Sequence, residues 1–240
     1  MARRRFFVDE VRHGLAVLTG DDGRHLRQVL RAEPGQLYEL SDNRSVYLAE
    51  IEAVGKDEVS FRIVEKLAAE EPPLRLTLFM ALIKFERFEW AIEKATELGV
   101  EAVVPVRAER SEKGLERAAR KRVERWRKIV RESSQQARRV RMPEVGVPMP
   151  LEAALQVPAV CRCFLDEDGG RPLLAAVPSG RAPGDRVCLA VGPEGGWTDS
   201  ERRLAAGQGW TTTTLGPAIL RAETAAIAAV AVLANAWLID

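Results

Sequence analysis

The chain has few of the side chains that most often bind metal ions or form hydrolase triads. It has only two histidines, His13 and His25, and both lie in the N-terminal part. A histidine metal cluster or a Ser-His-Asp triad in the C-terminal part is therefore excluded. Cys161 and Cys163 are separated by a single residue and have no histidine near them, which is a poor arrangement for zinc. We therefore expect no metal site.

Long apolar segments and common nucleotide-binding motifs are also missing. Except near the C-terminus, no run of about twenty apolar residues lacks charged residues, so we predict no transmembrane span and no membrane partner. Three cysteines and no recognisable signal peptide predict a reducing, cytoplasmic setting. Neither GxGxxG nor GxxxxGK[ST] occurs, so a Rossmann dinucleotide site and a P-loop are unsupported.

Positive charge is concentrated in one region, although the formal net charge of the chain is only +1. Between Arg107 and Arg141 there are 14 lysines and arginines against 5 acidic residues, and the rest of the chain is acidic overall. A further basic cluster, Arg3-Arg4-Arg5, lies at the N-terminus. This concentration favours binding to nucleic acid. A solvated, arginine-rich helix face is the alternative explanation.

Residues 1–70 are predicted to form a small domain rich in β-strands. Turn residues separate its short apolar runs, and one short helix is expected over 22–31. So many short strands favour a small barrel, with Phe6 and Phe7 in its core rather than stacked on a base. The segment KLAAEEPP is predicted to be a linker because its paired prolines stop regular structure. The runs that predict strands are 6–8, 15–18, 36–40, 46–51 and 59–64.

From residue 73 to residue 240 the pattern changes to alternating strands and helices, which predicts an α/β domain with a parallel sheet. The segment TDSE at 198–201 matches a helix capping box. The last helix is apolar almost all round, which predicts that it is buried, with a subunit interface as one place for it. The expected strands are 74–82, 102–106, 159–165, 187–191 and 211–215, and the expected helices are 85–98, 115–133, 198–207 and 221–238.

Two of these strands run directly into loops that contain glycine and proline. The run VCLAV at 187–191 is followed by GPEGG, and the run TTTTL at 211–215 is followed by GPAIL. Glycines allow a backbone to approach a ligand closely. Loops at the carboxyl ends of neighbouring parallel strands form the crevice where open α/β sheets bind ligands. We therefore expect a binding site here, with ordinary strand-to-helix turns as the alternative.

The same two segments, GPEGGW at 192–197 and LGPAILRAETA at 215–225, resemble the signature segments of the RsmE family. That family comprises the 16S ribosomal RNA uridine-N3 methyltransferases of the SPOUT superfamily. The segments KFERFEW at 84–90, KATELG at 94–99 and Arg110-Ser111 are also similar to it. In the N-terminal part, RRFF at 4–7 and HLRQVLR at 25–31 resemble the RNA-binding, PUA-like domain of the family.

The resemblance spans the chain and implies its organisation. It implies a PUA-like β-barrel RNA-binding domain over 1–70 and a SPOUT α/β methyltransferase domain over 73–240. In the second domain the C-terminal segment would thread a deep trefoil knot, an exception to the rule that chains are un-knotted. The implied cofactor is S-adenosyl-L-methionine. The implied partners are 16S rRNA of the small ribosomal subunit and a second copy of the chain in a homodimer.

The resemblance also implies a site. Arg221 would stabilise negative charge on the uracil oxygens, while Glu194 and Glu223 would accept the N3 proton or orient other groups. Glu223 has a structural alternative, because an acidic residue in the first turn opposes the helix dipole. Backbone groups of the two loops would hold the cofactor. The residues of the implied cofactor site are Leu165, Val191, Gly192, Pro193, Glu194, Gly195, Gly196, Leu215, Gly216, Ile219, Leu220 and Thr224.

RNA would be bound through phosphate contacts from arginines in both halves of the chain. Two segments depart from the family pattern: Ala218 stands where the family usually has arginine, and SSQQARR at 133–139 replaces an EQSGR-like run. The arginines expected to contact RNA are Arg3, Arg4, Arg5, Arg27, Arg31, Arg110 and Arg139.

Three other functions fit parts of the sequence. The first is a SPOUT enzyme that methylates a ribose 2′-hydroxyl or another base. The second is a non-catalytic RNA-binding or ribosome-assembly protein. The third is a small-molecule enzyme whose basic helix is only a solvated face.

Overall fold

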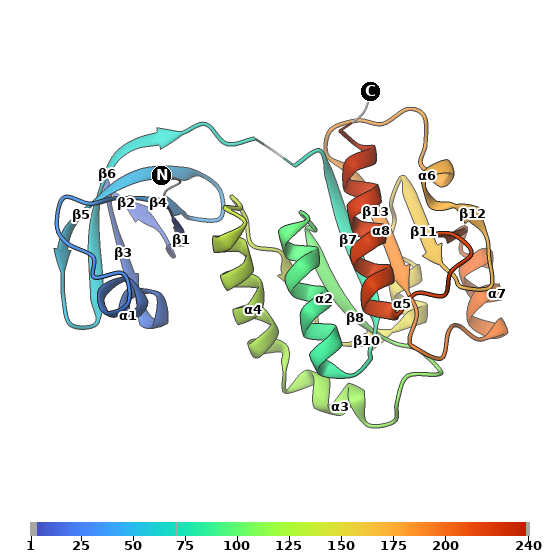
Figure 1. Cartoon of the computed structure of the whole chain (residues 1–240). Helices are drawn as coiled ribbons and strands as arrows, with labels where there is room; N and C mark the ends of the chain where they lie inside the picture. The colour runs from blue at the N-terminus through green and yellow to red at the C-terminus, as the bar shows by residue number, and fades with distance from the viewer. Residues whose placement is uncertain (1–3, 71, 239–240) are drawn as a thin grey trace. The chain divides into compact units, whose positions relative to one another are not determined.

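The computed structural model describes residues 4–70 and 72–238 (Figure 1). The chain divides into two compact units. The first unit contains the described residues of 1–70 together with 134–142, and the second contains those of 71–133 and 143–240. No pattern in the sequence indicated that residues 134–142 join the first unit.

The first unit is built on a sheet with the strand path β1-β4-β5-β6-β3-β2. β1 pairs with β4 in parallel, and the other pairings are antiparallel. Helix α1 (Gly20–Gln28) places Leu26 in a core with Leu18 and Phe61. Phe6 and Phe7 are buried, as predicted. The strands are β1 (Arg5–Phe7), β2 (Val11–Arg12), β3 (Leu15–Thr19), β4 (Leu37–Ser41), β5 (Val46–Val54) and β6 (Glu58–Leu67).

Residues 134–142 are held in the first unit by polar contacts. Arg5 donates to Glu39 at 3.1 and 2.8 Å, and Arg138 pairs with the other oxygen of the same carboxylate. Gln135 donates its amide to Asp22 at 2.8 Å. The side chain of Arg5 is only 12% exposed, so most of its surface contacts protein rather than solvent.

Glu39→Gln is expected to destabilise the first unit around β4 and residues 134–142. The substitution keeps the shape of the side chain but leaves the guanidinium of Arg5 without its counter-ion. We expect the free energy of unfolding to fall by about 1–3 kcal/mol. Hydrogen exchange at the amides of β4 and β5 measures the effect. Glu65→Gln is the matched control, because Glu65 lies exposed on β6. Equal exchange rates in the two variants would contradict the prediction.

The second unit contains a parallel sheet with the strand path β10-β8-β7-β13-β11-β14-β12, and β9 pairs with β8. Every pairing in this sheet is parallel, which confirms the predicted α/β class. The strands are β7 (Leu74–Ala81), β8 (Ala102–Arg107), β9 (Glu144–Val145), β10 (Met149–Pro150), β11 (Cys161–Leu165), β12 (Arg171–Pro172), β13 (Asp185–Val191) and β14 (Thr211–Thr214).

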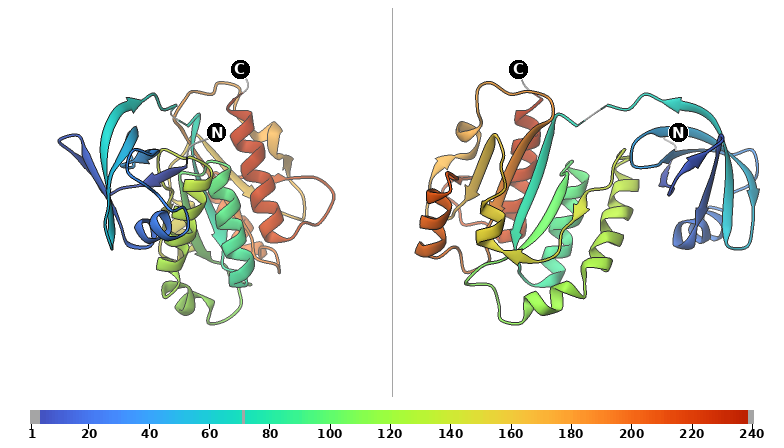
Figure 2. Two further views of the ribbon diagram at one scale, coloured as in Figure 1. Left: turned by 60° about the vertical axis from the view of Figure 1, so that its left-hand side comes forward. Right: turned by 180° about the vertical axis from the view of Figure 1, so that it is seen from behind.

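Helices cover both faces of the parallel sheet. Helices α2 (Phe85–Glu97) and α8 (Ala222–Ala236) lie side by side on one face (Figures 1 and 2). Helices α5 (Leu151–Leu155) and α7 (Asp199–Gly207) lie on the other face, over a core that includes Phe79, Phe164 and Trp210. The remaining helices are α3 (Leu115–Arg120), α4 (Val123–Gln136) and α6 (Leu173–Ala176).

Two details of the helices bear on the predictions. The capping box of α7 is confirmed, since the Thr198 side chain and the Glu201 side chain each bond the other residue's backbone N–H. The single helix predicted over 115–133 is wrong, because a turn separates α3 from α4. Ala119, Val123 and Trp126 are all buried, so the apolar spacing continues through the break and could not reveal it.

Among the helices of residues 4–70 and 72–238, none has the length and apolar character that a membrane span needs.

The chain crosses the sheet between its last strand and its last helix. β14 pairs with β11, whereas α8 packs against β7 and β13. Residues 215–221 therefore pass across the carboxyl ends of β11 and β13 to reach the helix. The trefoil knot implied by the resemblance stays a prediction.

Candidate active site

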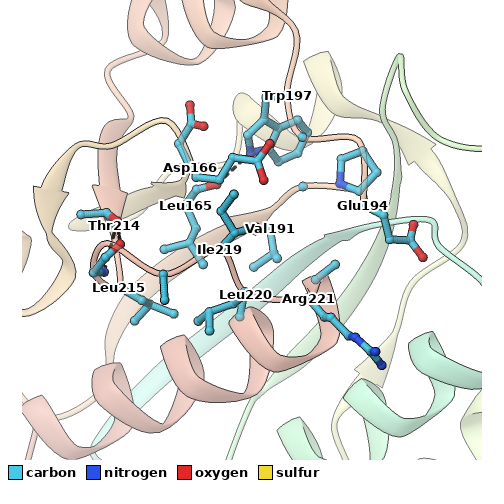
Figure 3. A pocket seen from close by; sticks show the side chains of 18 of the residues that line it. Leu165, Asp166, Val191, Glu194, Trp197, Thr214, Leu215, Ile219, Leu220 and Arg221 are labelled. Atoms are coloured by element: carbon cyan, nitrogen blue, oxygen red, sulfur yellow. Dashed lines mark hydrogen bonds between the residues drawn. The ribbon is translucent and has the colours of Figure 1, made fainter.

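A cavity of about 310 Å³ lies at the carboxyl ends of β11, β13 and β14 (Figure 3). Three segments supply most of its wall, namely residues 165–167, 191–197 and 214–222. Neighbouring strands bring these segments together, as expected for ligand sites in open parallel sheets. The volume is that of a site for a small organic molecule.

The loop after β13 is shaped by the indole ring of Trp197. This ring stacks on Phe164 with 4.5 Å between ring centroids, and its N–H donates to the carbonyl of Leu165 at 2.9 Å. A Cβ on Gly192 would lie 3.0 Å from the ring. A side chain at this position would force the indole to shift by a few tenths of an ångström, so glycine allows the loop to lie this close to the ring.

The end of the same loop is fixed by a left-handed glycine and an arginine. Gly196 has φ of +69°, a conformation that favours glycine. The guanidinium of Arg110 donates to the carbonyl of Gly195 at 2.8 Å. Arg110, which the sequence suggested for RNA binding, is exposed but already holds this loop in place.

The loop after β14 contributes apolar side chains and free backbone donors. Gly216 has φ of +134°, and the hydroxyl of Thr214 accepts a hydrogen bond from its N–H at 3.2 Å. Ile219 is 80% exposed although it is apolar. In the part of the chain that the structure describes, the N–H groups of Ile219 and Leu220 have no acceptor. A ligand with hydrogen-bond acceptors and an apolar ring fits this loop.

Asp166 and Glu167 follow β11 and line the cavity, and sequence reasoning missed them. Asp166 is held by Arg202 through hydrogen bonds of 2.7 and 3.1 Å. This carboxylate raises the pKa of Arg202 above its ordinary range. The charge of Asp166 is therefore largely compensated within the protein. The run DEDGG directly after a buried strand is the signal that could have indicated this loop.

Arg87, in the first turn of α2, also lines the cavity and was not predicted. Its Nη1 donates to Oε1 of Glu194 at 3.3 Å, and its Nε lies 3.7 Å from Oε1 of Glu223. It stands in the segment KFERFEW, which carried part of the resemblance. A single guanidinium thus faces two carboxylates that the sequence suggested for catalysis.

The structure brings most of the predicted site residues to one cavity. Gly195 does not line it, Thr224 is exposed on α8, and Glu223 is only 3% exposed and lies outside the lining. The predicted residues that do line the cavity are Leu165, Val191, Gly192, Pro193, Glu194, Gly196, Leu215, Gly216, Ile219, Leu220 and Arg221.

The arginines predicted to contact RNA differ in their exposure. Arg4 and Arg31 are exposed in the first unit, whereas Arg27 and Arg139 are partly buried there. Arg5 is engaged with Glu39, as described above. Arg3 lies outside the described residues.

The three cysteines lie buried in the parallel sheet. The sulfur atoms of Cys161 and Cys163 are 3.6 Å apart. Burial raises the pKa of Cys188 to about 11, so this thiol stays protonated at neutral pH. Across residues 4–70 and 72–238, no three histidine, cysteine or acidic side chains are grouped closely enough to hold a metal ion.

Comparisons with known proteins agree on one family. The model of an RNA methyltransferase domain matches residues 70–234, and that of an RNA methyltransferase PUA domain matches residues 18–64. The chain is 32% identical over 225 residues to ribosomal RNA small subunit methyltransferase E of Bacillus subtilis, covering 90% of this chain and 88% of that protein.

Two solved structures are similar over nearly the whole chain. One is a ribosomal RNA small subunit methyltransferase E from Neisseria gonorrhoeae bound to S-adenosyl methionine, with a TM-score of 0.87, 29% identity and 98% of each chain covered. The other is a methyltransferase from Legionella pneumophila in complex with the same cofactor, with a TM-score of 0.88, 32% identity and 98% of each chain covered.

Proposed function

Because the chain belongs to the family of ribosomal RNA small subunit methyltransferase E, we propose that it methylates N3 of a uridine in 16S ribosomal RNA. The proposed target is uridine 1498 in the conventional numbering of that RNA. The methyl donor is S-adenosylmethionine. The observation that carries the proposal is the cavity at the carboxyl ends of β11, β13 and β14, walled by two glycine-containing loops.

The residues of the cavity fit this cofactor. Leu165, Val191 and Leu220 offer apolar surface for a flat adenine ring, and the free N–H groups of the loop after β14 offer donors to its nitrogen atoms. Acidic side chains, Glu167 and Glu194, suit the positive charge that the cofactor carries. When bound, the cofactor supplies an electrophilic methyl group on a sulfonium.

The protein must align the uracil base, exclude water and accept a proton. Holding two reactants in line can supply a large part of the rate enhancement. Glu194 lines the cavity and is 39% exposed, so it is our candidate to accept the N3 proton. Arg221 lines the same cavity and is our candidate to stabilise negative charge on the uracil oxygens. Glu223 is assigned an orienting role because its carboxylate is buried.

A homodimer is part of the proposal. Partly exposed apolar side chains run along α8, including Ala225, Ala228 and Val232, and Ile219 beside it is 80% exposed. Apolar surface of this kind is stabilised by a second copy of the chain. Sedimentation equilibrium measures the association, and Val232→Glu is expected to yield monomers. A monomeric wild-type protein at all concentrations would contradict the dimer.

The test of the proposed reaction is methyl transfer from labelled S-adenosylmethionine to small ribosomal subunits from cells that lack this protein. Label recovered as N3-methyluridine after digestion supports the proposal. Label recovered in a ribose-methylated nucleoside would instead show that the enzyme methylates a ribose 2′-hydroxyl. No label from a folded protein that binds the RNA would favour a non-catalytic binding protein.

RNA binding is expected to depend on Arg4 and Arg31. Changing both to alanine removes two exposed positive charges from the first unit, so RNA affinity should fall. The slope of the logarithm of RNA affinity against the logarithm of salt concentration should become shallower by about one for each phosphate contact that is lost. Cofactor affinity should not change. Arg62→Ala is the control, because Arg62 is exposed in the same unit and paired with Glu50. Unchanged RNA affinity in the double variant would remove both arginines from the RNA site.

A further inference from the structure

Arg87 is placed at the cavity wall by the start of a helix. It lies in the first turn of α2, which packs against α8, and its side chain is 37% exposed. The charged groups that face it are Glu194, from the loop after β13, and Glu223, from α8. In the described residues, its Nη2 donates no hydrogen bond. This nitrogen is therefore available to a ligand.

Glu223 is a buried carboxylate beside Arg87. Its side chain is 4% exposed, and its Oε2 is buried without a hydrogen-bond partner in the described structure. A buried carboxylate is costly unless a cation compensates it. The only cation within 4.0 Å of it among the described residues is Arg87, with Nε 3.7 Å from Oε1. Glu223 is thus a fixed anion that draws the guanidinium of Arg87 to this part of the wall.

Glu194 differs from Glu223 in exposure and in position. It is 39% exposed and lies on a loop that lines the cavity, so its ion pair with Arg87 is partly solvated. Solvated ion pairs contribute little free energy, so breaking such a pair costs little. The pair with Glu194 can therefore give way to a substrate, whereas Glu223 keeps Arg87 in position.

We infer that Arg87, positioned by Glu223, is a catalytic cation that donates hydrogen bonds to a uracil oxygen as N3 loses its proton. The inference rests on the proposed methyl transfer to uridine N3. Arg87 would be a catalytic residue because it touches the reacting base, and Glu223 a positioning residue because it acts through Arg87.

The step requires such a cation for electrostatic reasons. The N3–H bond breaks and leaves its electron pair on the base, which spreads negative charge onto the two neighbouring carbonyl oxygens. N3 then bonds to the methyl carbon while the sulfur–carbon bond breaks and its electron pair stays on sulfur. The proton leaves to Glu194 or to water. A planar guanidinium beside an oxygen stabilises the anionic base and makes N3 easier to deprotonate.

Arg221, the other arginine that lines the cavity, has no buried carboxylate among the described side chains to hold it in place. It is the N-cap residue of α8 and is exposed, and no carboxylate in the described residues pairs with it. In Figure 3 its side chain extends away from Leu165 and Val191. Arg87 is the arginine in this cavity that the protein anchors with a buried counter-ion. Anchoring reduces the cost of reorganisation during the reaction.

The experiment compares Arg87→Gln, Arg87→Lys and Glu223→Gln with the wild-type protein, using small subunits that lack the modification. Arg203→Gln is the matched control, because Arg203 is an exposed arginine on α7. Arg87→Gln is expected to lower kcat by about a hundredfold to a thousandfold. Cofactor affinity and RNA affinity should stay within about threefold of the wild-type values. Thermal unfolding shows whether each variant is folded.

The pH profile separates a catalytic role from a structural one. At high pH the uracil N3 loses its proton without help from a nearby cation. The loss of kcat in Arg87→Gln, relative to the wild-type protein, should therefore shrink as the pH rises from about 7 to about 10. Arg87→Lys keeps the charge and should recover part of kcat. The double variant of Arg87→Gln with Glu223→Gln should be no slower than Arg87→Gln alone, because Glu223 acts through Arg87.

Each outcome distinguishes this inference from the proposed function. A wild-type protein that forms no N3-methyluridine overturns the function itself. A wild-type protein that forms it, together with an Arg87→Gln variant of equal kcat, overturns only the role of Arg87. A deficit that stays constant with pH, or additive losses in the double variant, would also exclude the proposed electrostatic role.

Discussion

Trp197→Ala is expected to lower the free energy of unfolding of the second unit by about 3–5 kcal/mol, the usual cost of truncating a buried tryptophan. The indole is only 1% exposed and stacks on Phe164. Its removal also takes away the surface against which Gly192 packs. The loop after β13 would lose its support, so cofactor affinity should fall by at least about tenfold, or about 1.4 kcal/mol.

Trp197→Phe separates the two contributions of the ring. Phenylalanine retains the aromatic contact with Phe164 but leaves the carbonyl of Leu165 without its donor, which should cost about 1–3 kcal/mol. Urea denaturation followed by circular dichroism measures stability, and calorimetry measures cofactor affinity. If Trp197→Ala bound the cofactor as tightly as the wild-type protein, the indole would have no part in shaping the cavity.

Gly170→Ala is expected to have the second large effect. Gly170 has φ of +145°, and a Cβ there would lie 2.7 Å from the carbonyl oxygen of Thr212 and 2.9 Å from the N of Thr213. The strained backbone costs about 1–3 kcal/mol. The clash is with backbone atoms of β14, which cannot move aside as a side chain can, and adds about 1–3 kcal/mol.

Gly169→Ala is the control for this prediction. Gly169 has φ of +118° but nothing within 4 Å of its added Cβ, so this variant carries the strain without the clash. The difference in unfolding free energy between the two variants measures the close approach of the loop to β14. Because the loop after β11 lines the cavity through Asp166, Gly170→Ala should also weaken cofactor binding. Identical stabilities would show that β14 does not constrain this loop.

The longer strands of the parallel sheet, β7, β8, β11, β13 and β14, could be predicted because they are runs of mostly apolar or β-branched residues. Leu74–Ala81 and Ala102–Arg107 lie within a residue of the predicted ends. The short strands β9, β10 and β12 were missed because two residues carry no periodicity. The placement of residues 134–142 in the first unit depends on polar contacts such as that of Glu39 with Arg138, which adjacent sequence does not encode.

The two loops of the cavity were predictable because glycine and proline mark them. Gly192 and Gly216 stand out in a sequence, and both line the cavity. Arg87 could not be assigned in this way, because it reaches the cavity through tertiary contacts, namely the packing of α2 on α8 and the pair of Arg87 with Glu194. Asp166 and Glu167 follow a strand, but the pairing of Asp166 depends on Arg202, which is 36 residues away in the sequence.

The membership of residues 134–142 in the first unit has a consequence for synthesis. The chain is synthesised from its N-terminus to its C-terminus, so the first unit cannot form all of its contacts when residue 70 leaves the ribosome. Its last part follows only after β7, α2, β8 and α3 have been made. The synthesis of the two units is therefore interleaved, and the first unit can complete its contacts only after part of the second has been made. A fragment ended at residue 70 should leave Arg5 and Glu39 without Arg138.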